Sequence, residues 1–176
     1  MVQERMIESE RLLLRPYRED DFEELHAMTS DVRVLQYLGS SPSTREESWA
    51  RLLRNIGHWT VKNYGALAIF EKASGRYVGN TGLAHYQRGL GDQFDPFPEA
   101  GWVLAYWSHG KGHASEAALA AHRWFDAQGH AGRTVCIIVP ENAGSFRVAE
   151  KLGYRPFGRG EHRGAAVVML ERLHGG

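Results

Sequence analysis

Apolar and polar positions alternate in short stretches of this chain and recur with a helical spacing in longer ones. Alternation is typical of a strand, whereas apolar positions three and four residues apart are typical of an amphipathic helix. The strands predicted in this way cover residues 11–15, 66–71, 77–85, 99–107, 134–139, 154–158 and 165–171. The predicted helices cover residues 20–28, 31–38, 44–63, 112–128 and 142–152, and a loop with two glycines and two prolines covers 87–98.

Residues at the ends of two predicted helices have the chemistry of helix caps. Ser43 or Thr44 precedes the long helix, and two glutamates in its first turn suit the positive end of the helix dipole. Asn142 precedes the last helix, and Gly153 stands where that helix is expected to end. These residues set the expected boundaries of both helices.

The order of the elements predicts the fold class. The strand–helix–strand run over residues 99–139 requires a parallel pair of strands, because a helix crossover joins strands that run in the same direction. The three consecutive strands before the crossover helix favour antiparallel pairing in the rest of the sheet. The prediction is an α/β (α+β) fold in which a mixed, mostly antiparallel sheet of about seven strands has helices on both faces.

The length of 176 residues predicts a single domain spanning residues 1–176. Basic and acidic residues balance at 21 each, so the chain lacks the bulk positive charge that would attract nucleic acid or a membrane surface. Met1–Glu10 has no apolar signal core, and no apolar stretch approaches the roughly 20 residues that span a bilayer, so a cytoplasmic location is expected. Cys136 is the only cysteine, and its apolar surroundings predict a small buried hydrophobic residue.

The segment 99–117 carries the main functional signal, because an apolar strand runs through a glycine turn directly into an alanine-rich helix. The first amides of a helix have no partner within the helix and can hold an anion such as a pyrophosphate. Gly110 and Gly112 allow backbone angles that are closed to other residues, and they let the backbone approach a phosphate closely. The segment therefore predicts a phosphate-bearing cofactor.

Two familiar phosphate loops do not fit this turn. A nucleoside-triphosphate loop needs Ser or Thr after its Gly-Lys pair, but Gly110-Lys111 is followed by Gly112 and His113, and the upstream glycine is absent. A dinucleotide fingerprint needs a third glycine where the chain has Ser115, and it opens its fold instead of following three strands. The remaining interpretation is a turn that holds one pyrophosphate at a helix start.

Three segments together resemble the GNAT superfamily of N-acetyltransferases. The turn is similar to its acetyl-CoA signature, Gln/Arg-x-x-Gly-x-Gly/Ala, with the sequence His109-Gly110-Lys111-Gly112-His113-Ala114. The last helix is similar to the family's Asn/Ser segment, with Asn142, Ser145 and Gly153 at the matching positions. The opening stretch 10–16, followed by Asp20-Asp21, resembles the branch of ribosomal-protein N-terminal acetyltransferases.

This resemblance implies how acetyl-CoA is held between the strands over 99–107 and 134–139. The pantetheine arm would pair with the first of these strands as an added strand does. A main-chain amide near Leu104 would polarise the thioester carbonyl. The pyrophosphate would meet the amides of Gly110–Ala114. The expected contacts with acetyl-CoA are Val103, Leu104, Ala105, His109, Gly110, Lys111, Gly112, His113, Ala114, Asn142 and Ser145.

Two residues are expected to be catalytic. Glu99 stands at the strand entrance beside the acidic loop of Asp92 and Asp95, where it would draw a cationic acceptor and take its proton; the alternative is a solvated strand-end glutamate. Many relatives have a tyrosine that protonates the departing thiolate, but the matching position here is Ala149. Ser145 fits the N-terminal acetyltransferase branch and would contact the cofactor near sulfur, or it serves only as a capping partner of Asn142.

The predicted reaction is direct transfer of an acetyl group from acetyl-CoA to a primary amine, such as a protein N-terminal α-amino group. The alternatives are a GNAT enzyme that acetylates a small metabolite or antibiotic, and a sensor that binds acyl-CoA without turnover. No metal is expected, because no nearby Cys, Asp or Glu completes a site with His109 and His113. The protein would act as a monomer or a homodimer.

Overall fold

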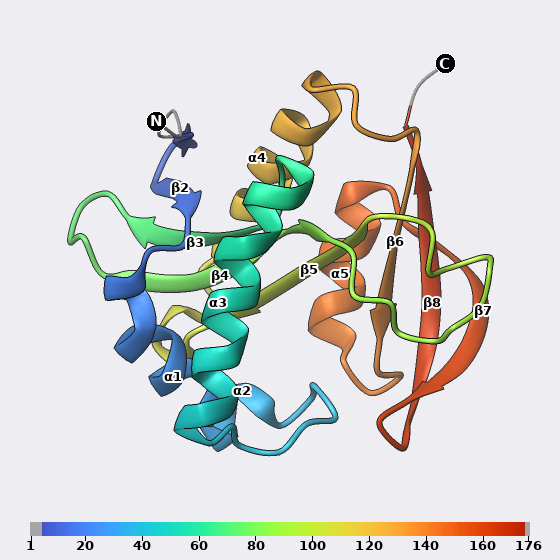
Figure 1. Ribbon diagram of the computed structural model, residues 1–176, viewed down its shortest axis with the longest axis horizontal. Coiled ribbons are helices and arrows are strands. Elements are labelled where there is room, and N and C mark those ends of the chain that lie inside the picture. Colours follow the sequence, from blue (N-terminus) through green and yellow to red (C-terminus); the bar gives the residue numbers. More distant parts are fainter. Residues whose placement is uncertain (1–4, 175–176) are drawn as a thin grey trace.

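A computed structural model describes residues 5–174, so the two ends of the predicted domain 1–176 lie outside the described residues. Eight strands in this part of the chain form one sheet in the order β1-β2-β3-β4-β5-β6-β8-β7 (Figure 1). Only β5 and β6 pair in parallel, and the other neighbours are antiparallel, as the sequence predicts. The strands are β1 (Ile7–Glu8), β2 (Leu12–Pro16), β3 (Ala66–Glu71), β4 (Tyr77–Ala84), β5 (Glu99–Leu104), β6 (Arg133–Ile138), β7 (Arg155–His162) and β8 (Ala165–Leu173).

The helices begin and end close to the predicted caps. Thr44 caps the long helix by accepting from the amide of Glu47, and Asn63 ends it in the left-handed conformation. Within residues 5–174, none of the helices combines the length and apolar content needed to cross a membrane. The α-helices are α1 (Phe22–Ser30), α2 (Val32–Leu35), α3 (Arg45–Lys62), α4 (His113–Ala127) and α5 (Ala143–Leu152), and short 3₁₀ turns cover Glu19–Asp21 and Tyr106–Ser108.

Three strands differ clearly from the prediction. The strand predicted over 154–158 continues to His162, and the other two differ for local reasons. The sheet has eight strands instead of about seven, because Ile7 pairs with Leu14 in a strand of two residues that is too short for a periodic pattern. The strand predicted over 99–107 ends at Leu104, where the amide of Ser108 donates to the carbonyl of Ala105 and starts a 3₁₀ turn. The backbone is therefore already turning when it reaches the glycines.

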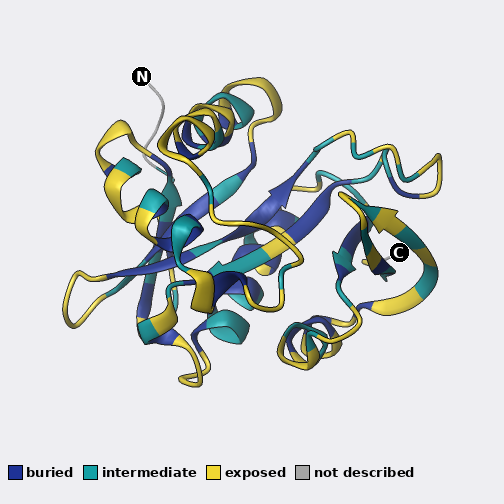
Figure 2. Ribbon diagram, turned by 90° about the horizontal axis from the view of Figure 1, so that it is seen from below, coloured by how far each residue is buried: buried dark blue, intermediate teal, exposed yellow. Residues whose placement is uncertain are grey.

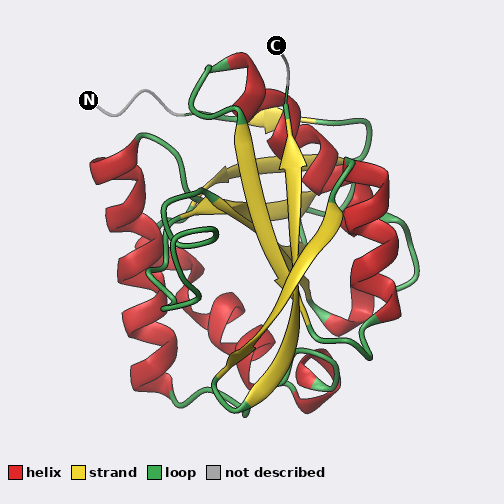
Figure 3. Ribbon diagram, turned by 90° about the vertical axis from the view of Figure 1, so that its right-hand side faces the viewer, coloured by secondary structure: helices red, strands yellow, loops and turns green. Residues whose placement is uncertain are grey.

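Helices cover both faces of the sheet (Figure 3). The core clusters to which alternate residues of β3 belong show which helix lies on which face. Leu67 and Ile69 belong to one core cluster with Ala117 of α4. Ala68, between them, belongs to another cluster with Leu25 of α1 and Leu52 of α3. Figure 2 shows that the buried residues concentrate on the central strands. Core clusters on both faces of the sheet thus support the central strands, from which the candidate site is built.

Candidate functional site

A cleft opens where the two parallel strands separate. Their register consists of one pair, Glu99 with Val135, and the amide of Val135 donates to the carbonyl of Pro98 at 2.9 Å. Beyond this point β5 crosses the view of Figure 1 while β6 and β8 run nearly at right angles to it. A main cleft of about 640 Å³ lies here, between β5, the 106–112 turn and the starts of α4 and α5. These are the two strands between which the family resemblance implies acetyl-CoA is held, and the structure shows them paired at one position only.

The glycine turn at the mouth of the main cleft offers free amides. Gly110 and Gly112 have φ of +74° and +77°, as their position in the sequence predicts, and α4 begins at His113 without a side-chain cap. Along residues 5–174, the last amide before the turn with a protein acceptor is that of His109, and the next is that of Glu116. The amides between them face no competing acceptor, so the turn suits an anion.

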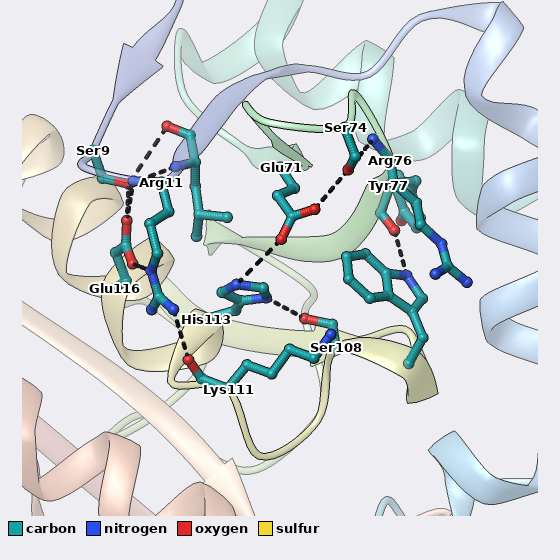
Figure 4. A network of polar contacts seen from close by, with 12 residues as sticks. Ser9, Arg11, Glu71, Ser74, Arg76, Tyr77, Ser108, Lys111, His113 and Glu116 are labelled. Atoms are coloured by element: carbon teal, nitrogen blue, oxygen red, sulfur yellow. Dashed lines mark hydrogen bonds and ion pairs between the residues drawn. The ribbon is translucent and has the colours of Figure 1, made fainter.

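The side chain of Arg11 connects this turn to the first turn of α4 by hydrogen bonds (Figure 4). Its Nη1 donates to the carbonyl of Lys111 at 2.9 Å, and its Nε donates to Glu116 at 2.7 Å. The other carboxylate oxygen of Glu116 accepts from the amide of Arg11 and from the hydroxyl of Ser9. The opening segment therefore fixes the conformation of a loop that is about 100 residues away in sequence.

The two histidines of the turn have structural side-chain contacts. The ring of His113 is buried, with Nδ1 at 2.6 Å from Ser108 Oγ and Nε2 facing Glu71, and burial lowers its pKa (Figure 4). The Nε2 of His109 donates to the carbonyl of Leu104 at 2.9 Å. Through residues 5–174, no group of three or more His, Cys, Asp or Glu side chains could hold a metal ion. His113 can therefore offer a ligand only its main chain.

The main chain of β5 alternates between β4 and the cleft. The amide of Ala105 donates to the carbonyl of Val78 on β4 at 2.8 Å, and Val103 pairs with Asn80 two positions earlier. Because paired residues alternate along an antiparallel ladder, Val103 and Ala105 direct their main-chain groups to β4, and Leu104 directs its groups to the cleft. The expectation that the main chain of Val103 and Ala105 is free for a ligand is therefore wrong.

Glu99 is neither solvated nor free at the strand entrance. Its side chain is buried, and both carboxylate oxygens accept from Arg88, at 2.7 and 2.8 Å. Burial raises the pKa of Glu99, and the hydrogen bonds from Arg88 oppose this rise. Arg88 also donates to Nε2 of His162 at 3.0 Å. Glu99 is thus a carboxylate held in a fixed orientation.

Two smaller cavities meet at Glu99. The junction cavity, about 220 Å³, shares Trp102 and Ser145 with the main cleft and reaches Glu99. The arginine cavity, about 170 Å³, continues from Glu99 toward α3. It is lined by Arg51, Arg54, Arg88, Arg163 and other residues. The glycine turn and Glu99 therefore lie along one continuous series of cavities.

Ser145 and Asn142 lie where the main cleft meets the junction cavity. The side-chain oxygen of Asn142 accepts from the amide of Ser145 at 3.0 Å and caps α5, and its amino group donates to the carbonyl of Tyr37. The hydroxyl of Ser145 accepts from Trp102 Nε1 at 3.2 Å. Since the indole N–H only donates, the proton of the hydroxyl remains available to a ligand. Ala149, one turn further along α5, is buried in the core.

The acceptor side of the site is where sequence reasoning fails. Asp95 lies close enough to Glu99 for its charge to raise the pKa of that carboxyl, but neither Asp92 nor Asp95 is among the described residues that line the small cavities. The carboxylate of Asp95 instead accepts from the amides of Leu90 and Gly91 and closes its own loop. Arginines line the cavities in their place. The spacing of Arg51 and Arg54, three residues apart on one helix, is the signal that could have indicated this.

Known proteins resemble this chain in sequence and in structure. Residues 11–155 match the family model described as "Acetyltransferase (GNAT) domain". The chain is 28% identical over 149 residues to the uncharacterized N-acetyltransferase YnaD of Bacillus subtilis (strain 168), over 85% of this chain and 82% of that protein. A solved protein of the GnaT acetyltransferase family from Bordetella pertussis is 32% identical, with a TM-score of 0.86 over 96% of this chain and 99% of that one. RimL, a ribosomal L7/L12 alpha-N-protein acetyltransferase in complex with coenzyme A, is 20% identical, with a TM-score of 0.78 over 97% and 98% of the two chains.

Proposed function

Because the chain belongs to the GNAT acetyltransferase family, whose members transfer an acetyl group from acetyl-CoA to an amine, we propose that it does so by direct attack of the bound amine on the thioester, with Glu99 as the base. The observation that carries this proposal is the continuous series of cavities from the glycine turn, past Ser145, to Glu99. The main cleft and the small cavities at Glu99 offer separate places for the cofactor and for the acceptor. That arrangement supports a ternary complex instead of an acetylated enzyme.

The free amides from Gly110 to Ala114 suit the pyrophosphate of acetyl-CoA, which supplies the acetyl thioester. Lys111 adds a positive charge beside the turn, although its ammonium group also lies over the ring of Trp107 at 4.6 Å. Leu104 directs its amide toward the cleft, where it suits the thioester carbonyl, while its carbonyl is engaged by His109. We therefore assign the pantetheine arm to the edge of β5 that Leu104 faces.

The acceptor amine must lose a proton to attack, because an ammonium group has no lone pair. In our proposal the Glu99 carboxylate takes this proton, the amine nitrogen bonds to the acetyl carbon, and the carbon–sulfur bond breaks. The second proton on the nitrogen passes to the departed sulfur, so the products are a neutral amide and a free thiol. The sulfur departs as a thiolate, which is stable enough to leave because a thiol has a pKa of about 8.5. The hydroxyl of Ser145 donates a hydrogen bond to this sulfur while it accepts one from Trp102.

The size of the acceptor side favours a small amine over a protein N-terminus. The junction cavity and the arginine cavity, about 220 and 170 Å³, are each smaller than the roughly 300–1,000 Å³ pockets that take drug-sized ligands. The likeness to RimL, at 20% identity, supports the fold and not a shared acceptor. The α-amino group of a protein therefore stands as the alternative acceptor in the test below.

The test combines an acetyl-CoA binding measurement with a panel of amines. At one hundred times its dissociation constant, acetyl-CoA should stabilise the fold by about 2.7 kcal/mol. Release of free thiol should depend on an added amine, and mass spectrometry should find the acetylated amine. Binding without thiol release from any amine or peptide would instead show a sensor.

Glu99→Gln tests the base. Removing a general base should lower kcat by about 10²-fold with little change in acetyl-CoA affinity, since Glu99 does not line the main cleft that holds the glycine turn. The wild-type rate should fall as the pH drops through the raised pKa of Glu99, because the carboxylate must be deprotonated to accept a proton. Glu150→Gln, on the exposed surface of α5, is the matched control and should keep full activity. A Glu99→Gln enzyme with an unchanged rate and pH profile would remove Glu99 from the mechanism.

A further inference from the structure

Three arginines around the Glu99 cavities have no anionic partner. Arg51 of α3 and Arg163 of the β7–β8 turn line both small cavities, and Arg54 lines the arginine cavity. Within the described chain, none of their guanidinium groups donates to a carboxylate or a carbonyl. Arg54 stacks on the ring of Tyr86, at 5.1 Å from its centroid. By contrast, Arg88 is fully engaged with Glu99 and His162.

The positive charge of these arginines is not neutralised by the protein. The arginine cavity is lined by four arginines and one carboxylate, and that carboxylate, Glu99, is already paired with Arg88. Arg51 is partly buried, and both its burial and the neighbouring charges of Arg54 and Arg163 lower its pKa. Arg54 and Arg163 are exposed, so water screens part of the repulsion between these like charges, and an anion bound between them would relieve the rest.

The positions of the base and the arginines define the shape of the acceptor. Glu99 lines both small cavities together with Arg51 and Arg163, so one small molecule can reach all three side chains. Its amine must lie toward Glu99 and the main cleft, where the thioester is attacked. Its other end then lies among the free guanidinium groups, which match carboxylate and phosphate oxygens in planar pairs.

We propose that the acceptor is a small amine that also carries an anionic group, a carboxylate or a phosphate, which Arg51 and Arg163 bind while the amine faces Glu99. This inference rests on the acetyl transfer proposed above and names its substrate class. A protein N-terminus lacks the feature, because an amide replaces the carboxylate that a free amino acid carries next to its amine. The surroundings of the amine thus select an anionic molecule and not a cationic one.

The experiment compares matched pairs of acceptors by kcat/KM. Each free amino acid of a panel is paired with its carboxamide, and phosphoethanolamine is paired with ethanolamine. The charged member of at least one pair should have a kcat/KM at least about tenfold higher, since hydrogen bonds between charged groups are lost with its neutral partner. The type of pair with the larger ratio of kcat/KM, charged over neutral, shows whether the preferred anion is a carboxylate or a phosphate. Equal kcat/KM within every pair, or a preference for neutral N-terminal peptides, would overturn the proposal.

Arg51→Met and Arg163→Met assign the effect to these side chains. Each should raise KM for the anionic amine by about tenfold, leave KM for acetyl-CoA unchanged, and have little effect on the neutral partner. Arg123→Met, on the exposed face of α4, is the matched control and should behave as wild type. Variants that keep the wild-type KM for the anionic amine would contradict the assignment, once their thermal unfolding shows that they fold.

A calorimetric measurement separates this inference from the proposed function. The anionic amines are titrated into enzyme saturated with coenzyme A, so binding is detected without turnover. Anion binding that is lost in Arg51→Met, without thiol release, would overturn the acetyl transfer but support anion recognition. Thiol release at the same rate from an acid and its amide, with no binding difference, would support the transfer but overturn anion recognition.

Discussion

The two helices that open onto the main cleft begin in opposite ways. At α4, Gly112 occupies the cap position with φ of +77°, and no side chain caps the helix. At α5, the side chain of Asn142 occupies this position and accepts from the amide of Ser145. One helix start thus leaves its amides to a ligand, while the other satisfies an amide itself and presents side chains. A helix dipole alone does not make an anion site; the absence of a cap does.

The same two helices are joined behind the cleft by a buried chain of hydrogen bonds. His122 of α4 contacts the hydroxyl of Tyr154, just beyond α5, at 2.9 Å, and that hydroxyl contacts Thr134 of β6 at 2.7 Å. The Nδ1 of His122 donates to the carbonyl of Ala118, so its Nε2 accepts from Tyr154 in the neutral ring. The cleft therefore opens at one end of two helices that are held together near the other.

The largest expected effect comes from acidification of this buried chain. Burial lowers the pKa of His122 from 6.5 to about 4, so the unfolded chain binds a proton between these values while the folded one does not. The free energy of unfolding is therefore highest above pH 6.5, where the ring is neutral in both states. It should fall by about 3 kcal/mol as the pH drops from 6.5 to 4. Urea unfolding of wild type and His122→Asn between pH 7.5 and 4 measures this loss. The variant should show a shallower dependence on pH, and two parallel curves would contradict the prediction.

The free helix start is tested by two glycine substitutions with the same local strain. Gly112→Ala and Gly153→Ala both force alanine into positive φ, +77° and +90°, and each should lower the free energy of unfolding by about 1 kcal/mol. Neither added methyl group meets an atom closer than 3.5 Å. Only Gly112→Ala should weaken acetyl-CoA binding, by about tenfold, because the amides of the turn must shift to relieve the strain. Calorimetry that finds equal affinities in the two variants would remove the turn from the binding site.

The smallest expected effect comes from removing the side-chain cap of α5. Asn142→Ala should lower the free energy of unfolding by about 1 kcal/mol, since the amide of Ser145 loses its acceptor. Asn142→Asp keeps an acceptor at the cap and should recover most of this loss. Chemical denaturation of the three proteins measures the difference. If alanine and aspartate were equally stable, the side chain of Asn142 would not be acting as the cap.

Local sequence signals predicted the elements that local chemistry determines. Thr44 and Asn142 cap their helices as expected, because each cap depends on an amide three residues further along the same chain. The positive φ of Gly110 and Gly112 was likewise predictable from their place between a strand and a helix. The two-residue strand β1 was missed because it exists only through its pairing with β2.

The sequence by itself determined the order of the elements, the glycine turn and the family resemblance, since these depend on neighbours along the chain. Only the tertiary structure decided what surrounds Glu99. Arg88 lies 11 residues from Glu99, His162 lies 74 residues from Arg88, and α3 and the β7–β8 turn bring Arg51 and Arg163 to the same cavities. The charge of a site depends on side chains that come from distant segments of the chain, and the spacing of residues in the sequence does not show which of them will meet. For this reason the cofactor side of the cleft could be read from the sequence, whereas the acceptor side could not.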